Sequence, residues 1–201
     1  MSNTKLLVIS GPSGCGKTTI AKEILHLHPD FFFSISATSR PKRMVEVHGK
    51  DYFFITRKEF EEKIRRDELA EWEQIYGDYY GSLKSEINRA FAAGTSILFD
   101  VDVKGALSIK KKYPMDTVLI FVQPPSIELL TERLRNRKTE TPETFAKRME
   151  RVAMELELAP EFDHTIINDV LEKAIGAVDE IVKCAIKLSE ASTIKINLKT
   201  K

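Results

Sequence analysis

The residues whose chemistry can be inferred most directly form a glycine-rich segment near the start of the chain. Gly11-Pro12-Ser13-Gly14-Cys15-Gly16-Lys17-Thr18 has the spacing G-x-x-x-x-G-K-[ST]. Glycines allow successive backbone N–H groups to point at one phosphate, in conformations that other residues resist. The motif predicts that Lys17 contacts the β- and γ-phosphates of a nucleoside triphosphate and that Thr18 is a Mg²⁺ ligand.

The flanking sequence supplies the context that this motif requires. The apolar run Lys5–Ser10 predicts a buried parallel strand before the loop, and a helix is predicted after it, from about Lys17 to His28. Such a helix points the positive end of its dipole at the bound phosphates. We therefore interpret residues 11–18 as a phosphate loop rather than a chance glycine-rich turn. Cys15 is interpreted as a tolerated small residue without a redox role.

Two carboxylates downstream are candidates for the same metal. Asp100 ends the apolar strand predicted at Ser96–Asp100, which is typical of a carboxylate that orders Mg²⁺ through water. Asp102 would share a face with Asp100 if the strand continues. Asp102-Val-Lys-Gly105 also matches the D-x-x-G motif of GTPases, but no N-K-x-D motif follows it. A GTPase switch is therefore disfavoured.

Composition excludes several other classes of protein. The chain has 201 residues, 31 Lys and Arg against 30 Asp and Glu, and 42% hydrophobic residues, which suggests one globular domain. No apolar run approaches the roughly 20 residues of a membrane span, and the balanced charge favours neither nucleic-acid nor membrane partners. The apolar start lacks a signal-peptide cleavage site. Two cysteines, Cys15 and Cys184, favour a reducing, cytoplasmic location.

Strands and helices alternate along the rest of the chain. Further strands are predicted at Thr117–Val122 and His164–Ile167. Helices are predicted over Thr56–Arg66, which a capping box of Thr56 and Glu59 begins, and over Lys84–Ala93, which Gly94 ends as its cap. Three more helices are predicted after Ser126, a favourable N-cap, after Thr141, and from Leu171. Short strands within 31–55 and an aromatic-rich strand over Leu69–Tyr80 form a β-rich patch, with Trp72 as a core residue. The alternation predicts a parallel α/β sheet interrupted by one antiparallel patch. The basic tail from Ser192 is predicted to be weakly strand-like.

Several segments beyond the phosphate loop together resemble the guanylate kinase family. They are Ser34–Arg43 (SISATSRPKR), Gly49–Tyr52 (GKDY), Glu71-Trp72 and Gly77–Ser82 (GDYYGS), and the resemblance runs from about Leu6 to the last helix. It implies the P-loop nucleoside monophosphate kinase fold, in which helices flank a parallel-sheet core. It divides the chain into a core (1–33, 84–125, 160–190), a β-rich GMP-binding region (34–83) and a helical lid (126–159). It also implies Mg²⁺-dependent transfer from ATP to GMP, and to dGMP.

The resemblance assigns a set of residues to GMP. They are Ser36, Arg40, Arg43, Tyr52, Glu71, Tyr80, Ser82 and Asp100. Two arginines clamp the GMP phosphate, which suits their planar forks, and two tyrosines hydrogen-bond it. Glu71 accepts hydrogen bonds from guanine N1–H and the exocyclic amine, and two serines donate to O6. Adenine presents the opposite pattern, so a buried Glu71 would be unpaired against AMP.

The lid is expected to supply further cations. Arg133–Glu140 resembles the mobile arginine-bearing segment of the family, and Arg137 and Arg148 are assigned to the transferring phosphoryl group together with Lys17 and Arg43. Arg148 flanks an apolar helical stripe and can face inward, whereas Arg135 is expected on a solvated face. Asn168 and Asp169 occupy the position that contacts adenine in the family.

Three departures from the family pattern are Met44-Val45, Lys104 and Lys138. None removes a charge that the chemistry needs. Two alternatives stay open: a related kinase acting on a sugar phosphate, and a guanylate-kinase-like scaffold that binds phosphopeptides. The intact Lys17-Thr18 pair argues against the scaffold, and the sequence leaves open whether the protein is a monomer or a homo-oligomer.

Overall fold

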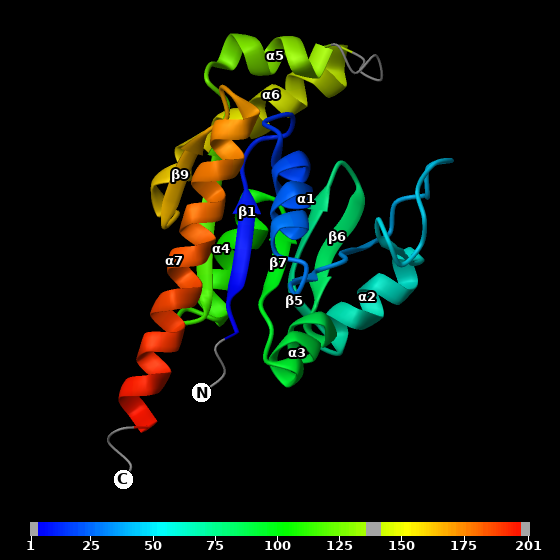
Figure 1. Ribbon diagram of the computed structural model, residues 1–201. Helices are drawn as coiled ribbons and strands as arrows, with labels where there is room; N and C mark the ends of the chain where they lie inside the picture. Colours follow the sequence, from blue (N-terminus) through cyan, green and yellow to red (C-terminus); the bar gives the residue numbers. More distant parts are fainter. Residues whose placement is uncertain (1–3, 136–141, 198–201) are drawn as a thin grey trace.

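A five-stranded parallel sheet forms the centre of the molecule in the computed structural model, which describes residues 4–135 and 142–197 (Figure 1). The strand order is β2 (Phe32–Phe33), β7 (Ile97–Asp100), β1 (Leu6–Ser10), β8 (Thr117–Gln123) and β9 (His164–Ile167). Ile9 lies beside Asp100 in the register of β1 and β7. The loop after β1 and the carboxylate that ends β7 therefore meet at one edge of the sheet.

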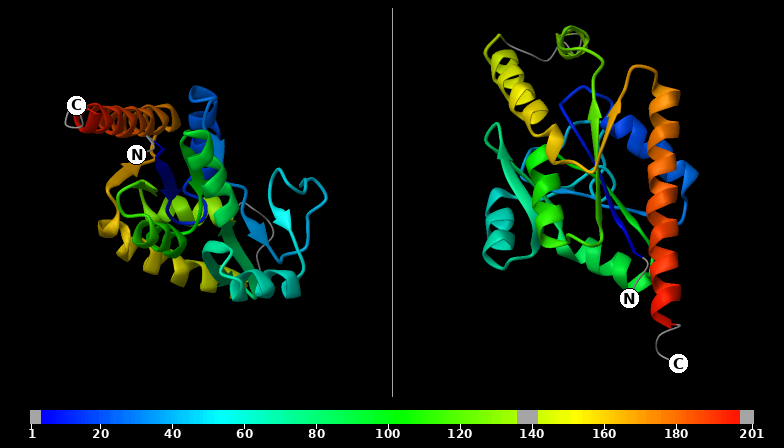
Figure 2. Two further views of the ribbon diagram at one scale, coloured as in Figure 1. Left: turned by 90° about the horizontal axis from the view of Figure 1, so that it is seen from below. Right: turned by 90° about the vertical axis from the view of Figure 1, so that its left-hand side faces the viewer.

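Helices cover both faces of this sheet (Figure 2). Helices α1 (Lys17–Leu27) and α7 (Leu171–Asn197) pack on one face, and α3 (Lys84–Ala93) and α4 (Val103–Lys112) pack on the other. Successive strand residues point to opposite faces, so Leu7 belongs to the α1 and α7 side and Leu6 to the α3 and α4 side. Both are fully buried. This three-layer core holds the edge of the sheet, and the loops on it, in place.

A second, smaller sheet lies beside the core. Its order is β4 (Phe53–Phe54), β3 (Ala37–Thr38), β6 (Asp78–Leu83) and β5 (Leu69–Ile75). Helix α2 (Arg57–Arg65) packs on this sheet through Phe60, and its start is fixed by a capping box between Thr56 and Glu59. The antiparallel hairpin of β5 and β6 turns at Tyr76 and Gly77, which both have positive φ.

Two more helices lie beyond the carboxyl ends of the central strands. They are α5 (Ile127–Arg135) and α6 (Pro142–Glu157), followed by a short 3-10 helix (Ala159–Glu161). Leu130, Leu134 and Val152 form a small core between the two helices. The Ser126 hydroxyl accepts the Leu129 N–H at 3.1 Å, so Ser126 caps α5 as predicted.

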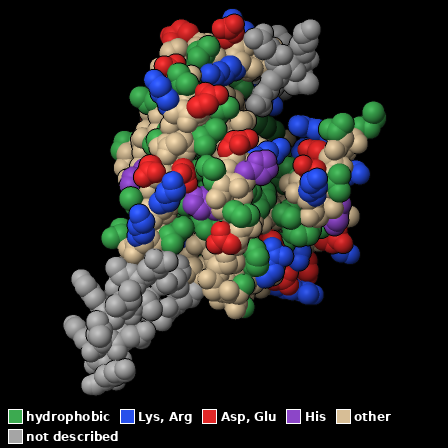
Figure 3. Space-filling model, viewed as in Figure 1, with side chains coloured by type: hydrophobic (Ala, Val, Ile, Leu, Met, Phe, Trp, Pro, Cys, Tyr) green, Lys and Arg blue, Asp and Glu red, His purple; other side chains and the backbone are tan. Residues whose placement is uncertain are grey.

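Acidic and basic side chains are interspersed over the face shown in Figure 3.

The structure corrects several expectations about local structure. The strand at Phe32–Phe33 joins the central sheet instead of the β-rich patch, and the single strand predicted over Leu69–Tyr80 is broken by the hairpin turn. The helix at Val103–Lys112 was not predicted, and α7 continues to Asn197 where a weakly strand-like tail was expected. Trp72 is 47% exposed and is not a core residue. Within residues 4–135 and 142–197, no helix has the length and apolar character that a membrane span needs.

Candidate active site

A pocket of about 500 Å³ opens at the carboxyl edge of the central sheet, between the phosphate loop, the second sheet and α6. It contains most of the residues that the sequence nominated. The lining includes Gly11, Ser13, Gly14, Gly16, Lys17, Thr18, Ser36, Arg43, Tyr52, Glu71, Tyr80, Asp100, Asp102 and Arg148. Residues from three separate parts of the chain therefore meet in one cavity.

The phosphate loop has the conformation that its glycines permit. Gly11 has φ +139°, and a Cβ there would lie 2.2 Å from the Val122 carbonyl oxygen. The Lys17 ammonium donates to the Gly11 and Pro12 carbonyls at 2.7 and 3.0 Å. Cys15 is buried, and burial raises the pKa of its thiol. The side chain is thus held in the neutral form, in keeping with a packing role.

Asn168 supports this loop from the last strand. Its side-chain amide is buried and donates to the Cys15 carbonyl at 2.8 Å. A Cβ on Gly16 would lie 2.4 Å from the same amide nitrogen, so Gly16 is needed for this approach. The neighbouring Asp169 is exposed. Neither residue lines the main cavity.

Thr18 and Asp100 form a compact oxygen site beside the loop. The Thr18 hydroxyl donates to Asp100 Oδ2 at 2.5 Å, across the junction of α1 and β7. A hydroxyl and a carboxylate are oxygen ligands that suit Mg²⁺, which is held by few protein groups, water and substrate phosphates. In keeping with that, the described residues include no cluster of three or more acidic, His or Cys side chains able to bind a metal by themselves. The donor set fits the ion.

Asp102 has a local role as a helix cap, which the sequence did not predict. Strand β7 ends at Asp100, so the two carboxylates do not share a strand face. Asp102 caps α4 by accepting the Gly105 N–H at 3.0 Å. Burial and the adjacent Glu73 raise its pKa to about 6. It lines the pocket as a helix cap.

Glu71 is a deeply buried carboxylate that faces the pocket. Its side chain accepts a hydrogen bond from the Ser82 hydroxyl at 2.6 Å, and the residue is only 4% exposed. Burial raises its pKa to about 7. Gly105 makes room for it: a Cβ there would lie 2.7 Å from Glu71 Oε2. Sequence reasoning missed Gly105, because the contact joins segments that are far apart in the chain.

The predicted phosphate-binding residues come from β6 and from the segment that joins β3 to β4. Arg40 donates hydrogen bonds from Nη1 and Nη2 to the two carboxylate oxygens of Glu46, at 2.9 and 2.8 Å. Hydrogen bonding to Arg40 lowers the pKa of Glu46 to about 2. Tyr52 and Tyr80 lie edge to face, with ring centroids 6.1 Å apart. Arg43 faces the pocket directly, whereas the fork of Arg40 is engaged by Glu46.

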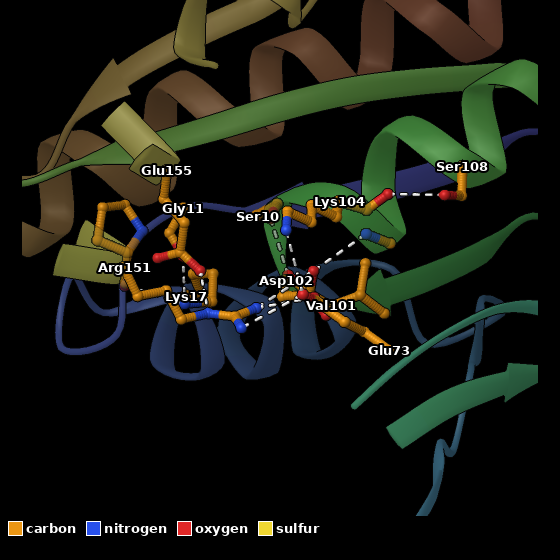
Figure 4. Close-up of polar contacts among 12 residues, drawn as sticks. Ser10, Gly11, Lys17, Glu73, Val101, Asp102, Lys104, Ser108, Arg151 and Glu155 are labelled. Carbon is orange, nitrogen blue, oxygen red and sulfur yellow. Dashed lines mark hydrogen bonds and ion pairs between the residues drawn. The ribbon is translucent and has the colours of Figure 1, made fainter. Parts of the chain in front are cut away.

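Helix α6 brings three charged side chains to the pocket. Arg148 lies with its guanidinium 5.7 Å from the Tyr76 ring centre. Arg151 and Glu155, which sequence reasoning did not single out, also line the cavity. Figure 4 shows the Arg151 guanidinium directed at Glu73 and Asp102. The i, i+4 spacing of Arg151 and Glu155 was the available sequence signal. Arg137 lies outside the described residues.

The fold and the pocket define a P-loop nucleoside monophosphate kinase, in which the phosphate loop and the second sheet line one cavity. Comparison with known proteins narrows this class. The family model described as guanylate kinase matches residues 3–185. A guanylate kinase of Gloeobacter violaceus is 45% identical over 89% of this chain and 87% of its own length. One of Thermotoga maritima is 45% identical over 89% and 86%.

A solved structure agrees with the sequence relatives. The crystal structure of guanylate kinase from Anaplasma phagocytophilum superposes with a TM-score of 0.74 and 28% identity, covering 92% of this chain and 87% of that one. This chain belongs to the guanylate kinase family.

Proposed function

We propose that the protein transfers the γ-phosphoryl group of ATP to GMP, and also to dGMP, and that the residues of this pocket perform the transfer. The observation that carries the base assignment is Glu71, a buried carboxylate fixed by Ser82 in the same cavity as the phosphate loop. An ionised carboxylate at this point accepts two hydrogen bonds from guanine. Adenine offers an acceptor at N1 and would leave the charge unpaired.

The mechanism needs no general base, because the phosphate of GMP is already an anionic nucleophile. Catalysis then depends on in-line positioning and on neutralising charge at the transferring group. Lys17 of the phosphate loop, Arg43 of the segment before β4, and Arg148 of α6 all line the pocket. We assign these three side chains, together with Arg137, to the phosphates. The Lys17 ammonium would exchange its two carbonyl partners for phosphate oxygens.

Mg²⁺ fits the oxygen site described above. Thr18 would coordinate the ion directly, and Asp100 and Asp102 would hold it through water. When bound, the ion would neutralise charge on the phosphates of ATP. Thr18 and Asp100 are already within hydrogen-bond distance, so the site needs little rearrangement to form.

Three parts of the chain share this work. We assign residues 34–83 to GMP, residues 126–159 to a lid, and the remainder to the core. Asn168 and Asp169 are assigned to the adenine side of ATP. The unpaired Cys15 and Cys184 suit a reducing cytoplasm.

A nucleotide panel tests the function. ADP release is measured by a coupled assay with GMP, dGMP, AMP, CMP and UMP as acceptors. We expect turnover with GMP and dGMP and little with the other three. Equal turnover across the panel, or no turnover with GMP, would refute the base assignment.

A further inference from the structure

Arg151 joins three parts of the molecule through one guanidinium. Its Nη2 lies 2.8 Å from Glu73 Oε2 and its Nη1 lies 3.4 Å from Glu73 Oε1. Its Nε donates to Glu155 Oε1 at 2.9 Å, and Asp102 Oδ1 is 3.6 Å from Nη2. The side chains of Arg151 and Glu73 are only 18% and 17% exposed. The pair is therefore shielded from most competition by water and salt.

The two partners stand next to groups that the proposed function uses. Glu73 follows Glu71 by two residues in β5, so both side chains lie on the same face of the strand. Arg148 precedes Arg151 by three residues, so both lie on the same side of α6. The Glu73–Arg151 contact thus connects the strand that binds the base with the helix that faces the phosphoryl group (Figure 4).

The surrounding charges hold this contact in one geometry. Lys104 Nζ lies 3.7 Å from Glu73 Oε1, so Glu73 has a second cationic partner. A two-point arginine–carboxylate contact also fixes direction, which a single point charge does not.

We propose that Arg151 is a positioning residue for phosphoryl transfer, and that its ion pair with Glu73 sets Arg148 on α6 relative to Glu71 on β5. The inference rests on the proposed function, since it takes Glu71 as the base reader and Arg148 as a phosphoryl contact. Arg151 acts through Arg148 and touches no reacting atom.

A double-mutant cycle tests the pairing. The variants are E73Q, R151Q, E73Q/R151Q and the conservative R151K, and the matched control is R66Q, which breaks an exposed pair with Glu62 on α2. We measure kcat and KM, the GMP dissociation constant by calorimetry, and thermal unfolding. We expect each single variant and the double variant to lose a similar factor in kcat, about ten- to a hundredfold. We also expect GMP affinity to change less than about threefold, partial recovery in R151K, and no change in R66Q.

Two contrary results are distinguishable. If the wild-type protein does not phosphorylate GMP, the proposed function is wrong, and the positioning role that rests on it is wrong as well. If the wild type is active but E73Q keeps its kcat, or the losses of E73Q and R151Q multiply in the double variant, the positioning role of the pair is wrong. A loss of kcat that only follows lower thermal stability would likewise show a structural contact.

Discussion

At the scale of single residues, Glu71 shows how burial prepares a carboxylate to recognise a base. Its two oxygens face the pocket side of β5, with Ser82 on one and Gly105 beside the other. The E71Q variant keeps the shape but replaces one acceptor by a donor. We expect GMP kcat/KM to fall about a hundredfold and the preference for GMP over AMP to erode. Unchanged selectivity in the acceptor panel would contradict the assignment.

The raised pKa of Glu71 predicts a pH dependence of GMP binding. The ligand-free carboxyl has a pKa of about 7 because it is buried, and only the ionised form accepts both guanine hydrogen bonds. The KM for GMP should therefore rise as pH falls below 7, by about tenfold per unit at the limit. KM is measured from pH 8 to 5.5. The same profile in E71Q separates this effect from titration of the GMP phosphate, and identical profiles would overturn it.

Arg148 is the described lid residue with the largest expected effect on rate. Removing an arginine that stabilises the transferring phosphoryl group costs about 10³ to 10⁵ in kcat. We expect R148Q to show a loss of this order with modest changes in KM. The control is R135Q, because Arg135 is exposed on α5. Comparable losses in both variants would indicate a general lid defect.

At the scale of elements, the close approach of α4 to β5 depends on Gly105. A methyl group there would lie 2.7 Å from Glu71 Oε2 and 3.1 Å from its Cδ. Overpacking of this kind costs about 1–3 kcal/mol, and alanine in a helix recovers about 1 kcal/mol of it. We expect G105A to fold, to displace the Glu71 carboxylate, and to raise the dissociation constant for GMP about tenfold. Calorimetry measures this dissociation constant, and a wild-type value in G105A would contradict the prediction.

Elements with strong local signals were predictable from sequence. The phosphate loop, the Thr56 capping box and the Gly94 cap of α3 each have a short motif with one physical solution, and the structure has all three. The membership of Phe32–Phe33 in the central sheet depends on a distant partner, β7. The hairpin turn at Tyr76 and Gly77 is local, and Gly77, which has positive φ, was a turn signal inside the segment predicted as one strand. Helix α4 was missed although Asp102 is a favourable N-cap, because the same residue was interpreted as a strand carboxylate.

The candidate site likewise contains residues that could be predicted from sequence and contacts that could not. Residue types at the expected spacing located most of the pocket lining, including Glu71 and Arg148. The Glu73–Arg151 pair and the Gly105–Glu71 approach join segments about 80 and 30 residues apart. Single-sequence patterns carry no information on such pairings, so only the folded chain shows them.

At the scale of the whole molecule, the pocket lies between the phosphate loop, the second sheet and α6. Helices α5 and α6 and the second sheet each contact the core through a limited set of elements. We expect ATP and GMP together to draw these parts inward and exclude water. Small-angle scattering with a non-hydrolysable ATP analogue and GMP should show a smaller radius of gyration than the free protein, approaching about 17 Å for a compact chain of this length. An unchanged radius would contradict this closure.

The two-point ion pair between Arg40 and Glu46 has a consequence for which ligands the enzyme binds. The Glu46 carboxylate presents two oxygens to the Arg40 guanidinium as a phosphate would. If Arg40 binds the GMP phosphate as proposed, Glu46 takes the place of that phosphate in the free protein. Guanosine has the correct base but no phosphate that could displace Glu46 from Arg40. The segment that carries Arg40 should therefore keep its conformation until a phosphate dianion binds. Nucleosides lack this group, so they should compete poorly with nucleotides for the enzyme.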